Sequence, residues 1–180
     1  MIFFAESSFS HTGAHAGNVL TSIAGAAGLY GDSVGVGTSA RFNAPLGVAV
    51  DPTTGNVYVT NSASHKVSLV LPNGTVSTLA GVAGAAAFGD GTGSTARFNA
   101  PYLVAWRAGS AALAAGVVVA DSANHRVRLV FTNGTVITLG GNGTAGHADG
   151  ALGTSMFSTP RGVAVHPVTL AVYVSDGARI

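Results

Sequence analysis

Two histidines stand at matching places in two similar stretches of the chain and could act as metal ligands. His65 follows Asn-Ser-Ala-Ser at 61–64, and His125 follows Asp-Ser-Ala-Asn at 121–124. Imidazole is a common ligand of zinc. However, Asn, Asp and Ser side chains in a turn bond to nearby backbone amides, and a position that every unit repeats is more simply structural. We therefore expect a structural turn, keep His65 and His125 as candidate metal ligands only, and predict no cofactor.

Residues that differ between matching positions are stronger binding candidates, because the fold does not demand them. Two such sets stand at the two ends of the same predicted strands, one position and six positions after a repeated proline, and two arginines precede that proline. The candidate binding residues are Arg41, Leu46, Asp51, Arg97, Tyr102, Arg107, Arg161 and His166. Loops and strand ends on a rigid scaffold are the usual place for such residues.

The composition of the chain bounds its chemistry. The chain has 180 residues, no cysteine, 8 basic and 7 acidic side chains, and a net charge of +1. Absent cysteine excludes disulfides and thiol catalysis, and the few carboxylates form no persuasive acid–base pair. The charge balance disfavours nucleic acid as a partner. The longest apolar run, 111–120, is shorter than the roughly 20 residues that a membrane span needs.

An internal repeat must position these candidates. Ala-Arg-Phe-Asn-Ala-Pro at 40–45 returns unchanged at 96–101, and a weaker copy ends at Pro160, so the prolines lie 56 and 59 residues apart. The segments 61–67 and 73–79 return at 121–127 and 133–139 in the same order. Several markers that share one order and one period indicate a repeat architecture.

Each unit divides into four short strands, which we name a to d in chain order. Apolar runs and turn residues predict them at 47–51, 56–60, 66–71 and 75–80, then at 102–106, 116–120, 126–131 and 135–139, with a third pair at 162–165 and 171–174. These runs are continuously apolar, which indicates that neighbours cover both faces. The sequence therefore predicts an all-β fold, a β-propeller of four-stranded antiparallel blades that is incomplete in this chain.

The two ends of the chain predict partial blades. Ile2–Ala5 resembles strand b of the next unit, and Leu20–Ala24 resembles strand d. We expect one partial propeller domain over 1–180, with a partial blade at 1–25, blades at 26–81 and 82–141, and a partial blade at 142–180. Half a ring exposes two apolar blade faces, which predicts a fragment of a longer protein or self-association through those faces. A head-to-tail dimer fits poorly, because strand b would be supplied twice at each junction.

The segments Arg41–Asp51, Gly55–Val59 and Asp121–Arg128 resemble the NHL-repeat family of β-propellers. The resemblance implies about six blades, used mostly to bind protein partners, and the family also includes RNA-binding members, lyases and hydrolases. Some related amidating lyases bind zinc at matching positions of successive blades, which would make His65 and His125 ligands.

The residues and the resemblance together favour a non-enzymatic protein-interaction scaffold, with a protein partner that the sequence does not identify. The alternative is a metal-dependent enzyme of the lyase or lactonase type, centred on the channel of the propeller. The scaffold is favoured because no constellation of nucleophile, base and orienting group stands out in the sequence.

Overall fold

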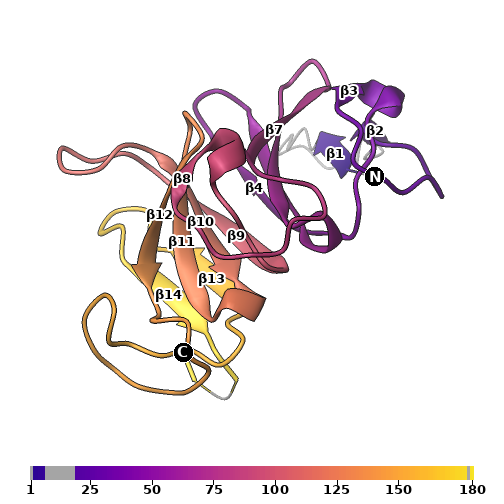
Figure 1. Ribbon diagram of the computed structural model, residues 1–180. Coiled ribbons are helices and arrows are strands. Elements are labelled where there is room, and N and C mark those ends of the chain that lie inside the picture. Colours follow the sequence, from indigo (N-terminus) through magenta and orange to yellow (C-terminus); the bar gives the residue numbers. More distant parts are fainter. Residues whose placement is uncertain (1, 7–18, 178) are drawn as a thin grey trace.

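The strands of the computed structural model, which describes residues 2–6, 19–177 and 179–180, lie close to the predicted ones. Blade 1 consists of β4 (Pro45–Val50), β5 (Val57–Asn61), β6 (Lys66–Val70) and β7 (Thr75–Gly81). Blade 2 consists of β9 (Pro101–Arg107), β10 (Gly116–Asp121), β11 (Arg126–Phe131) and β12 (Thr135–Gly140). The third unit holds β13 (Gly162–Val165) and β14 (Val172–Ser175). Neighbouring strands in each blade are antiparallel and follow chain order, and the blades stand side by side (Figure 1).

Each blade carries a fifth, two-residue strand that the sequence analysis treated as loop. β3 (Gly35–Val36) pairs with β7, and β8 (Gly91–Thr92) pairs with β12. A backbone hydrogen bond explains the order of this glycine-rich segment, because Gly37 N–H donates to the Gly74 carbonyl oxygen at 3.0 Å and Gly93 repeats the bond to Gly134. The turn between strands c and d of a blade therefore holds the connection that leads into strand a of the same blade.

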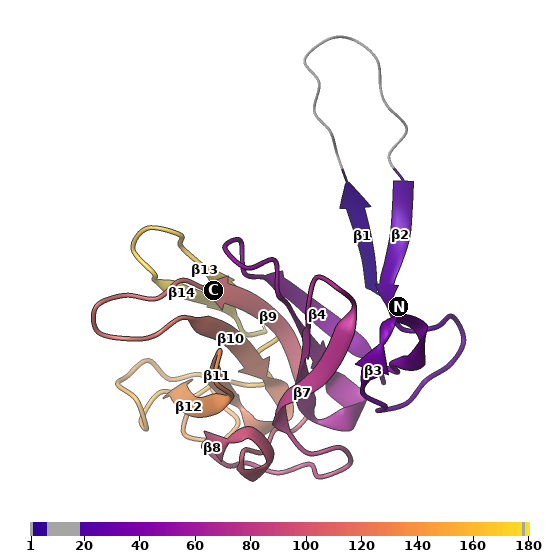
Figure 2. The same cartoon turned by 90° about the horizontal axis from the view of Figure 1, so that it is seen from above.

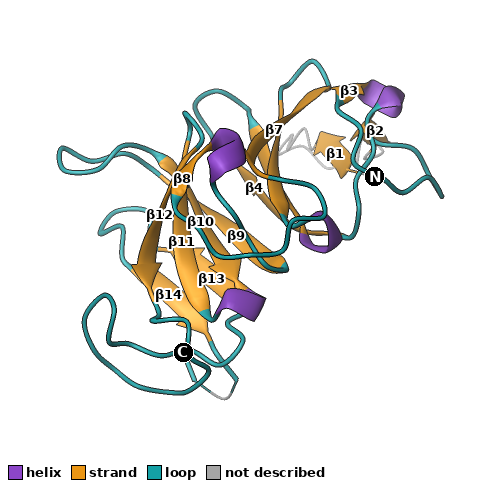
Figure 3. Cartoon of the chain, in the orientation of Figure 1, coloured by secondary structure: helices purple, strands orange, loops and turns teal. Residues whose placement is uncertain are grey.

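In the part of the chain that the structure describes, helical structure is confined to single turns between strands (Figure 3). Two turns follow the fifth strands, and two follow β5 and β10: η1 (Gly37–Ser39), η3 (Gly93–Thr95), η2 (Ser62–Ser64) and η4 (Ser122–Asn124). Within the described ranges, no helix has the length and apolar character needed to cross a membrane.

The N-terminal hairpin corrects one expectation. It consists of β1 (Ile2–Glu6) and β2 (Val19–Ala24). Ile2 lies opposite Ala24, as Val67 of strand c lies opposite Ala80 of strand d, and both registers shift at the next residue. β2 is therefore strand d as predicted, whereas β1 occupies the place of strand c and not of strand b. Strands b and c are both covered on two faces, so their apolar patterns are alike and the sequence did not separate them.

Three apolar clusters lie between successive units. Blade 1 packs on the N-terminal segment through Phe42, blade 2 packs on blade 1 through Phe98, and the third unit packs on blade 2 with Phe157 beside the cluster. Phe42 and Phe98 are buried, so these rings act as wedges between units. Every residue of β5 and of β10 is buried, which fits strands covered on both faces.

Candidate binding surface

The innermost strands of three successive units, β4, β9 and β13, lie next to one another. Gly47 permits the close approach of β4 to β9, since a Cβ atom there would lie 2.8 Å from the carbonyl oxygen of Tyr102 and the amide nitrogen of Val104. The Thr60 hydroxyl bridges the two strands by accepting from Gly47 N–H at 2.9 Å and donating to the Tyr102 carbonyl. The strand ends that carry the predicted residues are therefore held together.

One end of these strands presents Leu46, Tyr102 and Arg161, which we call the upper mouth. Leu46 is 43% exposed, Arg161 is exposed, and Tyr102 is half-buried. The Arg161 guanidinium lies over the Tyr102 ring, 5.6 Å from its centre, which is cation–π geometry. The backbone also joins the two units here, because Leu103 N–H donates to the Arg161 carbonyl at 3.2 Å. The structure thus brings these three predicted residues to one end of adjacent strands.

At the opposite end, Asp51 and His166 cap turns. Asp51 accepts the Thr53 N–H at 2.9 Å and the Thr54 hydroxyl at 2.7 Å. Burial alone would raise the pKa of Asp51, but these hydrogen bonds, led by that from Thr54, outweigh it and the pKa is lowered. His166 Nδ1 accepts the N–H groups of residues 168 and 169 at 3.2 and 3.1 Å. Two different side chains therefore perform the same turn-forming task.

Three of the arginines predicted as binding residues donate hydrogen bonds to backbone carbonyl groups. Arg107 is buried, and its Nη1 donates to Ala108 and Ala114 at 3.2 and 3.4 Å. Arg41 Nη1 donates to the carbonyls of residues 38 and 40 in its own loop, and Arg97 repeats this with residues 94 and 96. These guanidinium groups hold loops in place.

The candidate metal ligands His65 and His125 connect successive units. Both have left-handed backbone conformations, with φ of 57° and 53°. His65 Nδ1 accepts Ala100 N–H at 3.0 Å, and His125 Nδ1 accepts Thr159 N–H at 3.2 Å. The described part of the chain contains no group of three or more His, Cys, Asp or Glu side chains that could hold a metal ion. Each histidine therefore forms a hydrogen bond that joins its own unit to the next one.

Two features escaped the sequence analysis. Tyr58 and Trp106 stack with ring centres 5.5 Å apart, beside a groove of about 460 Å³ that also contacts Asp51. Burial raises the pKa of Tyr58, and the charge of Asp51 adds to the rise. These two rings are far apart in sequence and meet only because blades 1 and 2 stack, so no local signal predicts them.

The second feature is a buried ionic network in blade 2. Arg128 is fully buried and pairs with Asp121 at 2.8 Å and with Asp90 at 2.7 Å. The matching positions of blade 1 hold Asn61 and Ser68, which are hydrogen-bonded at 2.9 Å. The sequence did contain a signal for this network. The two units are otherwise similar, but at these two positions both residues are charged in blade 2 and both are neutral in blade 1.

Comparisons with known proteins agree with this architecture. The sequence profile of the NHL repeat matches residues 42–68. An alignment 99 positions long is 37% identical to the chloroplastic protein SUPPRESSOR OF QUENCHING 1 of Arabidopsis thaliana, and it covers 53% of this chain and 9% of that protein.

Solved structures show the same fold at low sequence identity. An auxiliary nutrient binding protein from Bacteroides ovatus superposes with a TM-score of 0.67 at 22% identity, over 78% of this chain and 36% of that one. An auxiliary nutrient binding protein from Bacteroides thetaiotaomicron superposes with a TM-score of 0.64 at 24% identity, over 72% of this chain and 34% of that one. The chain therefore spans about a third of the length of each of these structures.

Proposed function

We propose that this chain, whose residues 42–68 match the NHL repeat and whose blades are those of a β-propeller, is a non-enzymatic scaffold that binds a protein partner at the upper mouth. The observation that carries the proposal is the exposed stack of Arg161 on Tyr102 beside Leu46. The other predicted residues contact turns, loops or the next unit, so the fold itself accounts for them.

The chemistry of the upper mouth defines the kind of partner. Tyrosine and arginine are enriched among residues that dominate protein–protein binding energy. Arg161 forms no salt bridge with any described residue of this chain, so its guanidinium is available to a carboxylate. Leu46 offers apolar surface on the adjacent strand. A partner segment with an acidic residue next to an apolar one fits both groups.

The test compares protein capture by the purified chain and by Tyr102→Ala/Arg161→Ala. We expect the double variant to recover specific partners at least about tenfold less, because truncating a dominant contact costs more than about 1.4 kcal/mol. Val168→Ala is the control, since Val168 is 82% exposed and lies in the turn that His166 caps, at the opposite end of the inner strands. Equal recovery by all three proteins would contradict the proposal, provided that circular dichroism shows the same fold.

A further inference from the structure

The tripeptide Asn-Gly-Thr occurs three times in the chain and carries a reactive pair of groups. Its copies begin at Asn73, Asn133 and Asn142. In an Asn-Gly pair, the backbone nitrogen of the glycine can attack the side-chain carbonyl carbon of the asparagine, because glycine has no side chain to hinder the approach. Since the three copies have the same residue types, a difference in their reactivity comes from the fold.

The asparagine side chains are held alike in the three copies. Each Oδ1 accepts a hydrogen bond from the N–H group two residues further on, at 3.0 Å for Asn73, 3.0 Å for Asn133 and 2.8 Å for Asn142. This is the usual local bond of asparagine in a turn. The group that is attacked is therefore in the same state at all three places, and the attacking nitrogen makes the difference.

The first two copies form the turns between strands c and d, where the glycine nitrogen is already engaged. Gly74 N–H donates to the Leu71 carbonyl at 2.9 Å, and Gly134 N–H donates to the Phe131 carbonyl at 2.9 Å. Both glycines are buried, and their carbonyl oxygens hold the glycine-rich segments through the bonds described above. Attack by either nitrogen therefore requires local opening of a hairpin.

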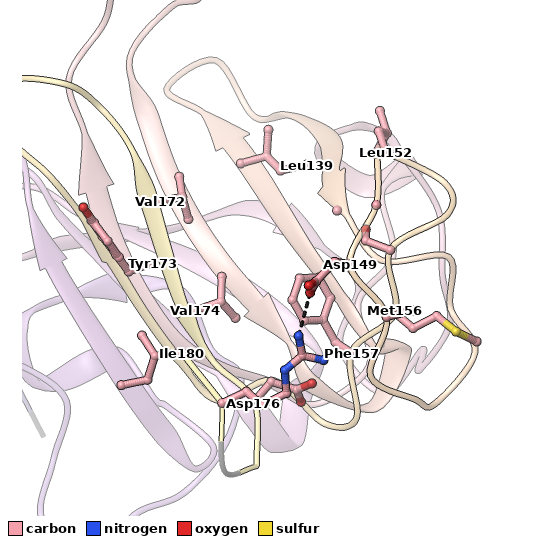
Figure 4. Close-up of a pocket in the computed structure, with 15 residues that line it drawn as sticks. Leu139, Asp149, Leu152, Met156, Phe157, Val172, Tyr173, Val174, Asp176 and Ile180 are labelled. Carbon is pink, nitrogen blue, oxygen red and sulfur yellow. Dashed lines mark hydrogen bonds and ion pairs between the residues drawn. The ribbon is translucent and has the colours of Figure 1, made fainter.

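The third copy lies in the loop that follows β12, on the side of blade 2 away from blade 1 (Figure 2). Asn142 and Gly143 are both half-buried, and among the described residues Gly143 N–H has no hydrogen-bond acceptor. The same loop walls a cavity of about 500 Å³, with Ser155 and Phe157 among its lining residues (Figure 4). The nitrogen of Gly143 is therefore free to react without opening of a blade.

A positive charge lies on the reacting peptide group of the third copy. Arg126 Nη2 donates to the Asn142 carbonyl oxygen at 2.8 Å, and this oxygen belongs to the same peptide group as the Gly143 nitrogen. Arg126 forms no salt bridge with any described residue. A guanidinium group on the carbonyl oxygen stabilises the anion that forms when the peptide N–H loses its proton. Gly143 permits this contact, since a side chain there would collide with the guanidinium.

We propose that Asn142 is a site of spontaneous modification, at which Arg126 promotes the conversion of the Asn142–Gly143 pair to a cyclic imide. Hydroxide removes the amide proton of Gly143, the nitrogen bonds to Cγ of Asn142, and the Cγ–Nδ2 bond breaks. Nδ2 takes a proton from water and leaves as ammonia. Water then opens the ring at either carbonyl, which gives an aspartyl or an isoaspartyl residue. The inference does not depend on the partner proposed for the upper mouth.

The product changes the loop that packs the third unit on blade 2. A carboxylate replaces a neutral amide beside Arg126, and the net charge of +1 falls by one. Asn142 N–H also donates to the Ser155 carbonyl at 2.9 Å and so ties the two ends of the loop together. The isoaspartyl form lengthens the backbone by one carbon beside this bond. The modification therefore adds an ion pair and loosens the loop.

Peptide mass spectrometry of the purified chain, incubated at mildly alkaline pH, measures the three rates in one sample. In the folded chain we expect Asn142 to be converted at least about tenfold faster than Asn73 or Asn133, because only the latter two require hairpin opening. In concentrated urea we expect the three rates to be similar, since the tripeptides are identical. The unfolded sample is thus the control for sequence effects.

A variant tests the part played by the guanidinium. Arg126→Gln should slow the conversion of Asn142 at least about threefold, because the glutamine amide can donate a hydrogen bond but carries no charge. Arg41→Gln is the matched control, since it removes a guanidinium that donates to loop carbonyl groups in blade 1, and it should leave the rate at Asn142 unchanged. Loosening of the loop would raise this rate, so a slower reaction is not explained by lost structure.

Three results would overturn the proposal. They are equal rates at the three sites of the folded chain, faster conversion of Asn73 or Asn133 than of Asn142, and an unchanged or raised rate at Asn142 in an Arg126→Gln variant whose circular dichroism matches that of the unmodified chain. The comparison of the three sites uses the unmodified chain, so it remains decisive if the variant does not fold.

Discussion

At the scale of single residues, blade 2 contains a charged network where blade 1 has a neutral pair. Arg128 is fully buried between Asp121 and Asp90. A buried charge that loses its partner is costly, whereas replacing both partners by a neutral pair of suitable shape can be nearly neutral. Asn61 and Ser68 show that this fold accommodates the neutral pair.

We therefore expect Arg128→Ser to lower the free energy of unfolding by about 3–5 kcal/mol, because it leaves Asp121 buried without its cation. Adding Asp121→Asn should recover about 1–3 kcal/mol, since it removes the uncompensated charge. Urea unfolding of the two variants and of Asp121→Asn alone completes a double-mutant cycle. Additive losses would show that the two side chains are not coupled.

A second residue-scale prediction concerns pH. The pKa of Asp51 is lowered in the folded chain, so its ionised form stabilises the fold above the usual aspartate pKa of about 3.9 and this contribution is lost as pH falls further. We expect Asp51→Ala to cost about 1 kcal/mol at neutral pH, through the loss of its turn hydrogen bonds, and the difference attributable to ionisation to vanish in acid. Asp149→Ala, whose carboxylate is 93% exposed, should change stability by less than about 0.5 kcal/mol. A loss for Asp51→Ala that grows in acid would contradict this sign.

At the scale of elements, the inner strands must approach closely for the upper mouth to form. The place of closest approach that we identify is Gly47, where no side chain separates β4 from β9. A methyl group there would press on backbone atoms of Tyr102, Leu103 and Val104, which flexible side chains cannot relieve.

Gly47→Ala should therefore destabilise the chain by about 1–3 kcal/mol and weaken binding at the upper mouth. The matched control is Gly89→Ala, because a Cβ atom at Gly89 would make only an ordinary contact, 3.7 Å from Arg97. Thermal unfolding of both variants checks the prediction. If both variants melt together with the unmodified chain, the two strands are not closely packed at this point.

The elements also show what the sequence could predict. Strands a to d were recognisable because the apolar runs and the Asn-Gly turns at residues 73 and 133 repeat together. The short strand β3 was not recognisable, since the backbone of a distant turn orders it. The strand identity of β1 was also missed, because strands b and c share one hydrophobic pattern. Among the candidate residues, the sequence could not separate Tyr102 from Arg107, whose exposure depends on tertiary contacts.

At the scale of the whole molecule, stability comes from stacking each unit on the next. The apolar clusters lie between units, with Tyr58 of blade 1 and Val117 of blade 2 in the same cluster. A unit that loses its neighbour exposes an apolar face, so the two blades should open together and not one at a time.

Amide hydrogen exchange of the unmodified chain tests most directly the claim that one repeat builds two equivalent, stacked blades. The central strands β5 and β10 are fully buried, and their hydrogen bonds break only when a blade opens. We predict that residues 57–70 and 116–131 exchange slowest in the chain and at similar rates, except in the turns between their strands. Unprotected exchange in either segment would contradict the account.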